Sequence, residues 1–124
     1  MQKINEVTPS IAFEMIEKGA VLVDVRESRE ATMKSFDISD MMQIPLSDFG
    51  KRYPEIPMNS KVILACRSGH RSMMAAGFLA ENGYGHVFNL QDGIMNWERA
   101  GLPTKKAAQE GFLSRFMPGF LSEA

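Results

Sequence analysis

The residues best suited to chemistry lie together in one short segment in the middle of the chain. Cys66 is the only cysteine, and it directly follows the apolar run Lys61–Ala65. The next residues are Arg67, Ser68, Gly69, His70, Arg71 and Ser72. A helical pattern then runs from Ser72 to Asn82. We therefore predict that Cys66 opens a loop between the carboxyl end of a strand and a helix that starts around Arg71 or Ser72.

A loop of this kind is suited to holding an anion. The first N–H groups of a helix lack partners within the helix, and the helix dipole adds partial positive charge there. Arg67 and Arg71 contribute two full positive charges, and Gly69 allows the loop to adopt a positive φ. These features are predicted to lower the pKa of the Cys66 thiol, and the thiolate is the nucleophilic form. They favour a reactive cysteine over an ordinary buried one.

Composition excludes several classes of function. The chain has 124 residues and a formal net charge of −1, which fits one domain with no attraction for nucleic acid or anionic membranes. A single cysteine forms no internal disulfide, and no Cys/His cluster offers zinc ligands, so neither a metal nor a cofactor is expected. No signal peptide is visible, and the apolar runs are far shorter than the ~20 residues of a membrane span. The expected location is cytoplasmic.

The elements that must position Cys66 alternate between strands and helices. Short runs with apolar residues on both faces predict strands at Val21–Val25 and Lys61–Ala65 and, more weakly, at His86–Leu90; Met42–Ile44 is a further short strand candidate. Helical patterns are expected from Thr8-Pro9 to Gly19 and over residues 28–34, 47–53, 72–82 and 94–100. This alternation predicts an α/β domain with a mostly parallel sheet and right-handed crossovers. Ligands of such sheets bind beyond the carboxyl ends of the strands, where Cys66 is expected.

The chain after Pro103 has its own pattern. The compact domain is predicted to end there, and residues 104–124 are expected to form an apolar, helical tail. Its apolar residues recur at helical spacing: Phe112, Leu113, Phe116, Met117, Phe120 and Leu121. Such a stripe is unfavourable in water. Residues 105–124 are therefore expected to fold back on the domain or to form a contact such as a homodimer, with binding to a membrane surface as the least favoured option.

The cysteine segment and its flanks resemble one known family. The stretch from Cys66 to Ser72 is similar to the active-site loop of single-domain rhodaneses, the thiosulfate sulfurtransferase family. Further matches stand in the family's order: Asp24-Val25-Arg26-Glu27 with Glu30, Ile44-Pro45-Leu46, and a closing segment with Gly93-Ile94, Trp97 and Ala100–Pro103. Asp92 departs from the family, since glycine is usual there, as do Phe36-Asp37 and Asp40-Met41 in an earlier loop. The resemblance covers about residues 4–103.

The resemblance implies a fold and a reaction. Residues 1–103 would form a rhodanese-like three-layer domain, with a central parallel sheet of about five strands flanked by helices and followed by the helical tail. Cys66 would take the outer sulfur of a donor, become a persulfide, and pass the sulfur to a thiol or cyanide acceptor. The N–H groups from Arg67 to Ser72 would hold the terminal sulfur, and Arg67 and Arg71 would bind a small anionic donor such as thiosulfate.

The remaining polar residues receive supporting roles. Ser68 and Ser72 are expected to hydrogen-bond within the loop or to cap the helix. His70 is expected at the rim, with proton transfer as its alternative role. Asp24 and Arg26, at the end of another strand, either support the loop or form a structural salt bridge.

Two other functions compete with sulfur transfer. Phosphatases related to rhodaneses also use a cysteine followed by an arginine, but five residues separate the two there and four separate Cys66 from Arg71. The shorter loop favours a single sulfur over a tetrahedral phosphate. The second alternative is a non-catalytic module that binds a partner or senses oxidation through Cys66, which would need an outside thiol because the chain has no second cysteine.

Overall fold

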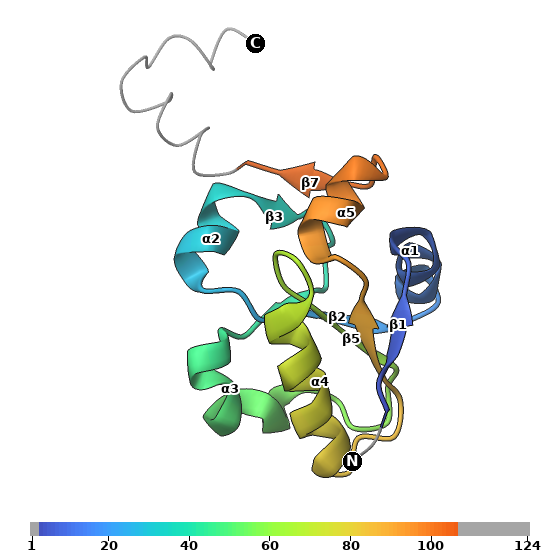
Figure 1. Cartoon of the computed structure of the whole chain (residues 1–124), viewed down its shortest axis with the longest axis vertical. Helices are drawn as coiled ribbons and strands as arrows, with labels where there is room; N and C mark the ends of the chain where they lie inside the picture. Colours follow the sequence, from blue (N-terminus) through green and yellow to red (C-terminus); the bar gives the residue numbers. More distant parts are fainter. Residues whose placement is uncertain (1–2, 107–124) are drawn as a thin grey trace, which may run out of the picture.

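Five strands form one parallel sheet at the centre of the molecule in the computed structural model, which describes residues 3–106 (Figure 1). Across the sheet the order is β1 (Asn5–Val7), β6 (Val87–Leu90), β5 (Val62–Ala65), β2 (Val21–Asp24) and β4 (Met42–Gln43). Every neighbouring pair is parallel. The predicted α/β fold with a five-stranded parallel sheet is thereby confirmed.

Helices cover both faces of this sheet. On one face lie α3 (Leu46–Arg52), the short 3-10 helix η1 (Tyr53–Glu55) and α4 (His70–Glu81); on the other lie α1 (Pro9–Glu17) and α5 (Gly93–Arg99). Successive side chains of a strand point to opposite faces, so Val62 and Leu64 of β5 join the core under α4, and Ile63 and Ala65 join the core under α1 and α5. Cys66 continues the first set and faces α4.

A smaller unit lies beside the carboxyl ends of the strands (Figure 1). It consists of α2 (Ser28–Met33) and a two-stranded antiparallel ribbon of β3 (Ser35–Phe36) and β7 (Thr104–Lys105). Trp97 of α5 is fully buried beneath it, with its indole N–H donating to the carbonyl oxygen of Pro103 at 2.9 Å. Phe13 and Phe36 meet the Trp97 ring edge to face. This aromatic cluster fixes α5, and hence the segment behind Cys66.

The sequence located most elements but not all of them. The Thr8 hydroxyl accepts the Ile11 N–H at 3.4 Å, and α1 begins at Pro9 as predicted. In contrast, α4 begins at His70, before the expected Arg71 or Ser72, because Gly69 already takes the capping position. The sequence did not predict β1 or the β3–β7 ribbon, and through this ribbon the packed chain extends to Lys105, beyond Pro103.

Some expectations concern the chain outside the structure described. The tail residues 107–124 and their predicted helix lie outside the described residues. Within residues 3–106 no helix is long and apolar enough to span a bilayer. Over the same range no group of three or more His, Cys, Asp or Glu side chains is arranged to bind a metal ion.

Candidate active site

Cys66 is the first residue after β5, at the carboxyl edge of the sheet. Its side chain is almost completely buried, with 1% of its surface exposed. Two hydrogen bonds from the start of α5 hold the backbone from behind: Ile94 N–H donates to the Cys66 carbonyl oxygen at 2.9 Å, and Met95 N–H donates to that of Arg67 at 3.3 Å. Cys66 is thus held between strand β5 and the start of α5.

Gly93 allows the start of α5 to lie close enough to the cysteine segment for these hydrogen bonds. It has a φ of +62°, and a Cβ atom on it would overlap the carbonyl oxygens of Cys66 and Arg67. The preceding Asp92 also has a positive φ, of 58°, which few residues other than glycine adopt readily. Asp92, at the position where the resemblance leads us to expect glycine, thus takes a left-handed backbone conformation.

The Cys66 sulfur is surrounded by hydrogen-bond donors. Gly69 N–H lies 3.1 Å from Sγ, Ser72 N–H 3.4 Å and the Ser72 hydroxyl 3.3 Å. Gly69 directs its N–H inward by adopting a φ of +104°, the left-handed conformation that glycine adopts without strain. The loop therefore curls around the sulfur as predicted, and the start of α4 points at it.

These donors lower the pKa of the Cys66 thiol. Burial raises the pKa of Cys66, but the hydrogen bonds from Ser72 Oγ and from the backbone N–H groups of Ser72, Gly69 and Ser68 outweigh it and leave the pKa below its ordinary value. The direction agrees with the sequence prediction. The main cause differs from the expected one. Hydrogen bonds to the sulfur lower this pKa, and the charges of Arg67 and Arg71, which were expected to lower it, are not its leading cause.

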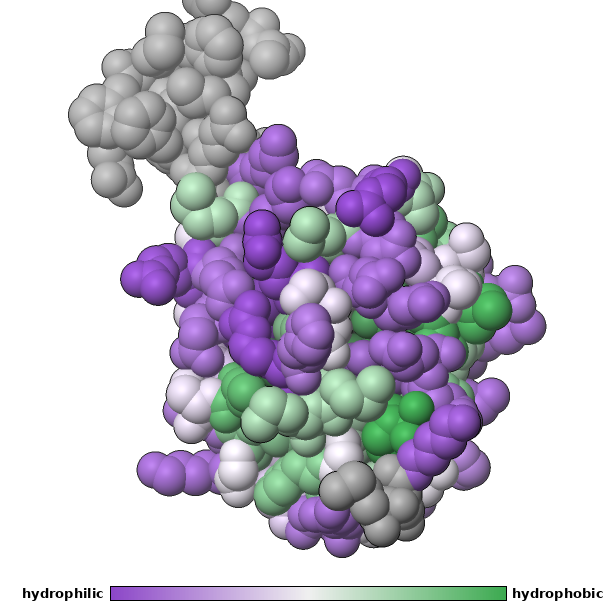
Figure 2. Space-filling view, in the orientation of Figure 1, coloured by the Kyte–Doolittle hydropathy of each residue, from purple (hydrophilic) through white to green (hydrophobic). Residues whose placement is uncertain are grey.

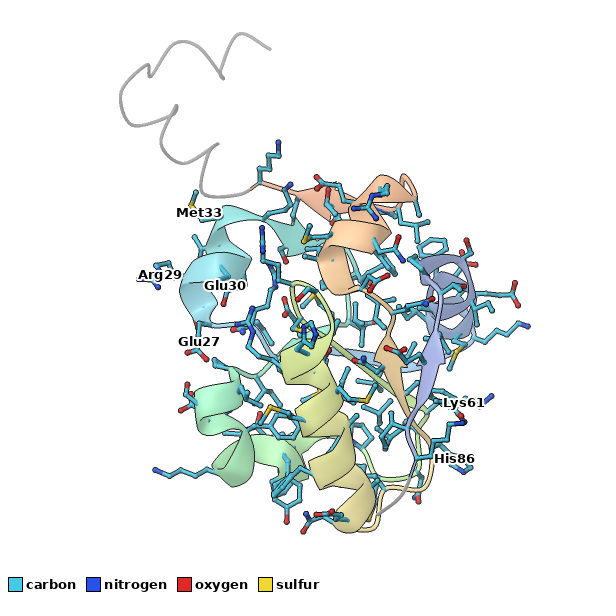
Figure 3. All side chains as sticks on the ribbon, viewed as in Figure 1. Glu27, Arg29, Glu30, Met33, Lys61 and His86 are labelled. Atoms are coloured by element: carbon cyan, nitrogen blue, oxygen red, sulfur yellow. The ribbon has the colours of Figure 1, made fainter. Side chains whose placement is uncertain are left out.

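Arg71 is already paired with a carboxylate. Its Nη1 and Nη2 donate to the two oxygens of Glu30 on α2 at 2.7 and 2.9 Å. The hydrogen bond from Arg71 holds the pKa of Glu30 at about 2. Figure 3 shows Glu30 on the side of α2 that faces α4, whereas Arg29 points away into solvent. The charge that the sequence analysis assigned to Arg71 therefore has a carboxylate partner that the sequence did not predict.

Arg67 and His70 lie at the exposed rim of the loop. Arg67 is exposed, and among the described residues it forms no ion pair. His70 is also exposed, with Nδ1 3.4 Å from the Ser68 hydroxyl. The surface over α2, α5 and this loop is mostly hydrophilic, while apolar side chains gather lower on this face, over α3 and α4 (Figure 2). The charge of Arg67 therefore lies at the polar surface beside the loop.

Asp24 and Arg26 form a buried ion pair at the carboxyl end of β2. Arg26 Nη2 lies 2.8 Å from Asp24 Oδ2, and Nε donates to both carboxylate oxygens. Arg26 Nη2 also donates to the carbonyl oxygen of Lys34 at 2.9 Å, just past the end of α2. The pair therefore fixes the segment that carries Glu30. Its link to the cysteine loop is indirect and runs through the Glu30–Arg71 contact.

Comparison with known proteins places this site in a family. The Rhodanese-like domain family matches residues 8–100. The chain belongs to this family. It is similar to a protein named sulfurtransferase from Allochromatium vinosum (42% identical, 67% of this chain and 76% of the relative). It is also similar to thiosulfate sulfurtransferase GlpE of Actinobacillus pleuropneumoniae (32% identical, 86% and 97%).

Solved structures support the same fold. The crystal structure of a rhodanese-related protein from Thermoplasma volcanium matches with a TM-score of 0.74 at 26% identity, covering 82% of this chain and 97% of that one. The rhodanese-like assignment made from the sequence is confirmed.

Sequence reasoning missed three residues of this rhodanese-like site. Glu30 was noticed as part of a motif, but its partner Arg71 was not foreseen. Asn89 is fully buried and bonds to Ser72 and Gly69, and Glu6 bonds to Asn89. The available signal was the position of Asn89, a polar residue in the middle of an otherwise apolar strand, where a buried amide must find partners.

Proposed function

We propose that this rhodanese-like domain is a sulfurtransferase of the thiosulfate sulfurtransferase type, with Cys66 as the sulfur carrier. The carrying observation is the set of donors from Gly69 and Ser72 around a buried sulfur. These donors stabilise negative charge on a sulfur atom that is shielded from solvent. Family membership and the printed names of the relatives support the same reaction.

The first half of the cycle loads the cysteine. The Cys66 thiolate attacks the outer sulfur of thiosulfate. A bond forms between the two sulfurs, the bond to the sulfonate sulfur breaks, and sulfite leaves with the electron pair. Arg67 at the rim attracts the dianion and the departing sulfite. The N–H groups of the first turn of α4, which lack partners within the helix, hold the negative terminal sulfur of the persulfide.

The second half discharges the cysteine. Cyanide or a thiolate attacks the terminal sulfur, the sulfur–sulfur bond breaks, and its electron pair returns to Cys66 as a thiolate. The same hydrogen bonds from Ser72 and Gly69 stabilise this leaving group. Neither half needs a general acid, because sulfite and the stabilised thiolate are good leaving groups. His70 therefore shapes the rim in this scheme.

The test follows one sulfur atom. The intact mass of the reduced protein is measured after thiosulfate and again after cyanide. We expect a gain of one sulfur that cyanide removes, with thiocyanate released in equal amount. Because Cys66 is the only cysteine, the added mass identifies its own site, and Cys66→Ser is the matched control. A free thiol that gains no sulfur from thiosulfate or from a low-molecular-weight persulfide would contradict the proposal and favour a binding or redox-sensing module.

Phosphate chemistry receives no support from the site. The arginine that would bind a phosphate, Arg71, is engaged by both oxygens of Glu30. Four residues separate Cys66 from Arg71, the short loop expected to favour a single sulfur over a tetrahedral phosphate.

A further inference from the structure

Asn89 occupies a place where strand residues are usually apolar. It is fully buried in β6, between β1 and β5. Its amide nitrogen donates to the carbonyl oxygen of Gly69 at 3.1 Å and to the carboxylate of Glu6 at 3.0 Å. A side-chain amide has two N–H donors and both are used, so the orientation of the amide is fixed. Its oxygen Oδ1 therefore faces Ser72, at 2.6 Å from Oγ.

The Ser72 hydroxyl has two neighbours but only one proton. Oγ lies 2.6 Å from Asn89 Oδ1 and 3.3 Å from Cys66 Sγ. Oδ1 can only accept, so Ser72 donates to it and leaves a lone pair for the S–H of a neutral Cys66. A thiolate can also only accept. The hydroxyl proton must therefore turn away from Asn89 before Ser72 can stabilise a negative sulfur.

We propose that Asn89 is a positioning residue that competes with Cys66 for the Ser72 proton. The hydroxyl donates to Asn89 while Sγ carries no charge, as a thiol or as the inner sulfur of a persulfide, and it donates to Sγ while Sγ is an anion. This inference rests on the sulfur-transfer cycle proposed above, in which charge leaves Sγ on loading and returns on discharge. Glu6 contributes by fixing the amide from β1.

Several charged groups lie around this pair, and each is the same in every variant used below. Those on the elements packed against it are Glu6 of β1, Asp24 and Arg26 beside β2, Glu30 of α2, Arg71 of α4 and Asp92 before α5. Arg67 and His70 of the cysteine loop are also present in every variant, so the effects of all these groups on the titration are common to the variants compared.

Two substitutions at Asn89 distinguish competition for the Ser72 proton from a purely structural role of this residue. Asn89→Leu removes the amide donors to Gly69 and Glu6 together with the acceptor for Ser72, whereas Asn89→Asp removes the amide donors and keeps an acceptor for Ser72. The readout is a pH titration of the thiolate by its ultraviolet absorbance, with the Cys66→Ser spectrum subtracted. We expect the pKa of Cys66 to fall in Asn89→Leu, with a roughly three- to tenfold rise in the thiolate-to-thiol ratio, about the size of one net hydrogen bond. We expect it to rise in Asn89→Asp.

The same pair is then measured with Ser72→Ala. The added carboxylate also repels the thiolate directly, and this part persists without Ser72. The effect of competition for the Ser72 proton disappears in this background. The difference in thiolate-to-thiol ratio between Asn89→Leu and Asn89→Asp should therefore shrink by roughly the same three- to tenfold factor. Asn96→Leu, which alters an amide on α5 that bonds to the Gln91 carbonyl oxygen, is the matched control and should leave the titration unchanged.

Either of two results would overturn the inference. One is a shift of both Asn89 variants in the same direction, as a purely structural role predicts. The other is a difference between them that Ser72→Ala does not reduce. Thermal unfolding shows which variants are folded, and Asn89→Val, whose branched side chain suits a strand, serves as a second apolar replacement. The titration uses no sulfur donor, so its outcome is independent of whether thiosulfate loads Cys66.

Discussion

Replacement of Gly93 by alanine tests how firmly the Cys66 loop is held from behind. The new methyl group would overlap the carbonyl oxygens of Cys66 and Arg67. Those two oxygens accept the hydrogen bonds that tie the loop to Ile94 and Met95. Either the loop or the first turn of α5 must therefore move, and the hydrogen bonds between them must lengthen or break.

The expected loss of stability is large. A left-handed backbone disfavours a residue with a Cβ by about 1–2 kcal/mol. Overfilling a packed site adds about 1–3 kcal/mol. These contributions overlap with the loss of the two hydrogen bonds, so we expect a total of about 2–5 kcal/mol, a substantial part of the stability of a small domain. The midpoint of thermal unfolding should fall by roughly 10 °C or more.

The assay combines thermal unfolding with the thiolate titration. In Gly93→Ala the displaced loop should lose donors to Sγ, so the pKa of Cys66 should rise at a temperature where the variant is still folded. Gly77→Ala is the matched control, because Gly77 is an ordinary helical residue of α4 with open space around it. It should gain up to about 1 kcal/mol. A fall of less than about 3 °C for Gly93→Ala, with an unchanged thiol pKa, would refute the reasoning.

Three further outcomes follow from the structure. Glu30→Gln frees Arg71, so the KM for thiosulfate should fall. The pKa of the Glu30 carboxyl group is lowered to about 2, so its pairing with Arg71 stabilises the fold at pH values above the ordinary pKa of 4.5. The variant should therefore be less stable by up to about 1 kcal/mol between pH 5 and 8, with the difference vanishing as pH falls toward 2, and a constant difference in urea unfolding would contradict this. Asp24→Asn leaves the buried Arg26 guanidinium without its carboxylate and should lower the free energy of unfolding by about 3–5 kcal/mol; a loss under about 1 kcal/mol in denaturant titration would argue against it. A chain ending at Lys106 keeps the β3–β7 ribbon. It should sediment as a smaller species or be less soluble than the full chain. Unchanged mass and solubility would contradict a covering or dimerising role for the removed segment.

Local sequence signals predicted the centre of the fold well. The strands β2, β5 and β6 were visible because each is a short apolar run buried on both faces. The loop after Cys66 was visible because a core strand is followed at once by glycine, serine and basic residues. In both cases neighbouring residues in the sequence carry the information, so periodicity and residue type suffice.

The missed features depend on distant partners. Arg71 and Glu30 are 41 residues apart, and only the packing of α2 beside α4 brings them together. The strand β1 has three residues, and the first two are exposed, so no alternation can be recognised. Asn89 acquires its role from β1 and α4 simultaneously. No local pattern contains such contacts.

The central position of β5 has a consequence for how Cys66 reacts. This strand is hydrogen-bonded on both sides and covered by both helical layers, so its amides should be among the slowest to exchange with solvent deuterium. We therefore expect that local fraying of the sheet does not expose the sulfur, and that reagents reach it by way of the exposed loop residues Arg67, Ser68 and His70. A small alkylating agent should therefore react with Cys66 far faster than a bulky one. That selectivity for size should persist as denaturant is added and disappear only where the whole domain unfolds.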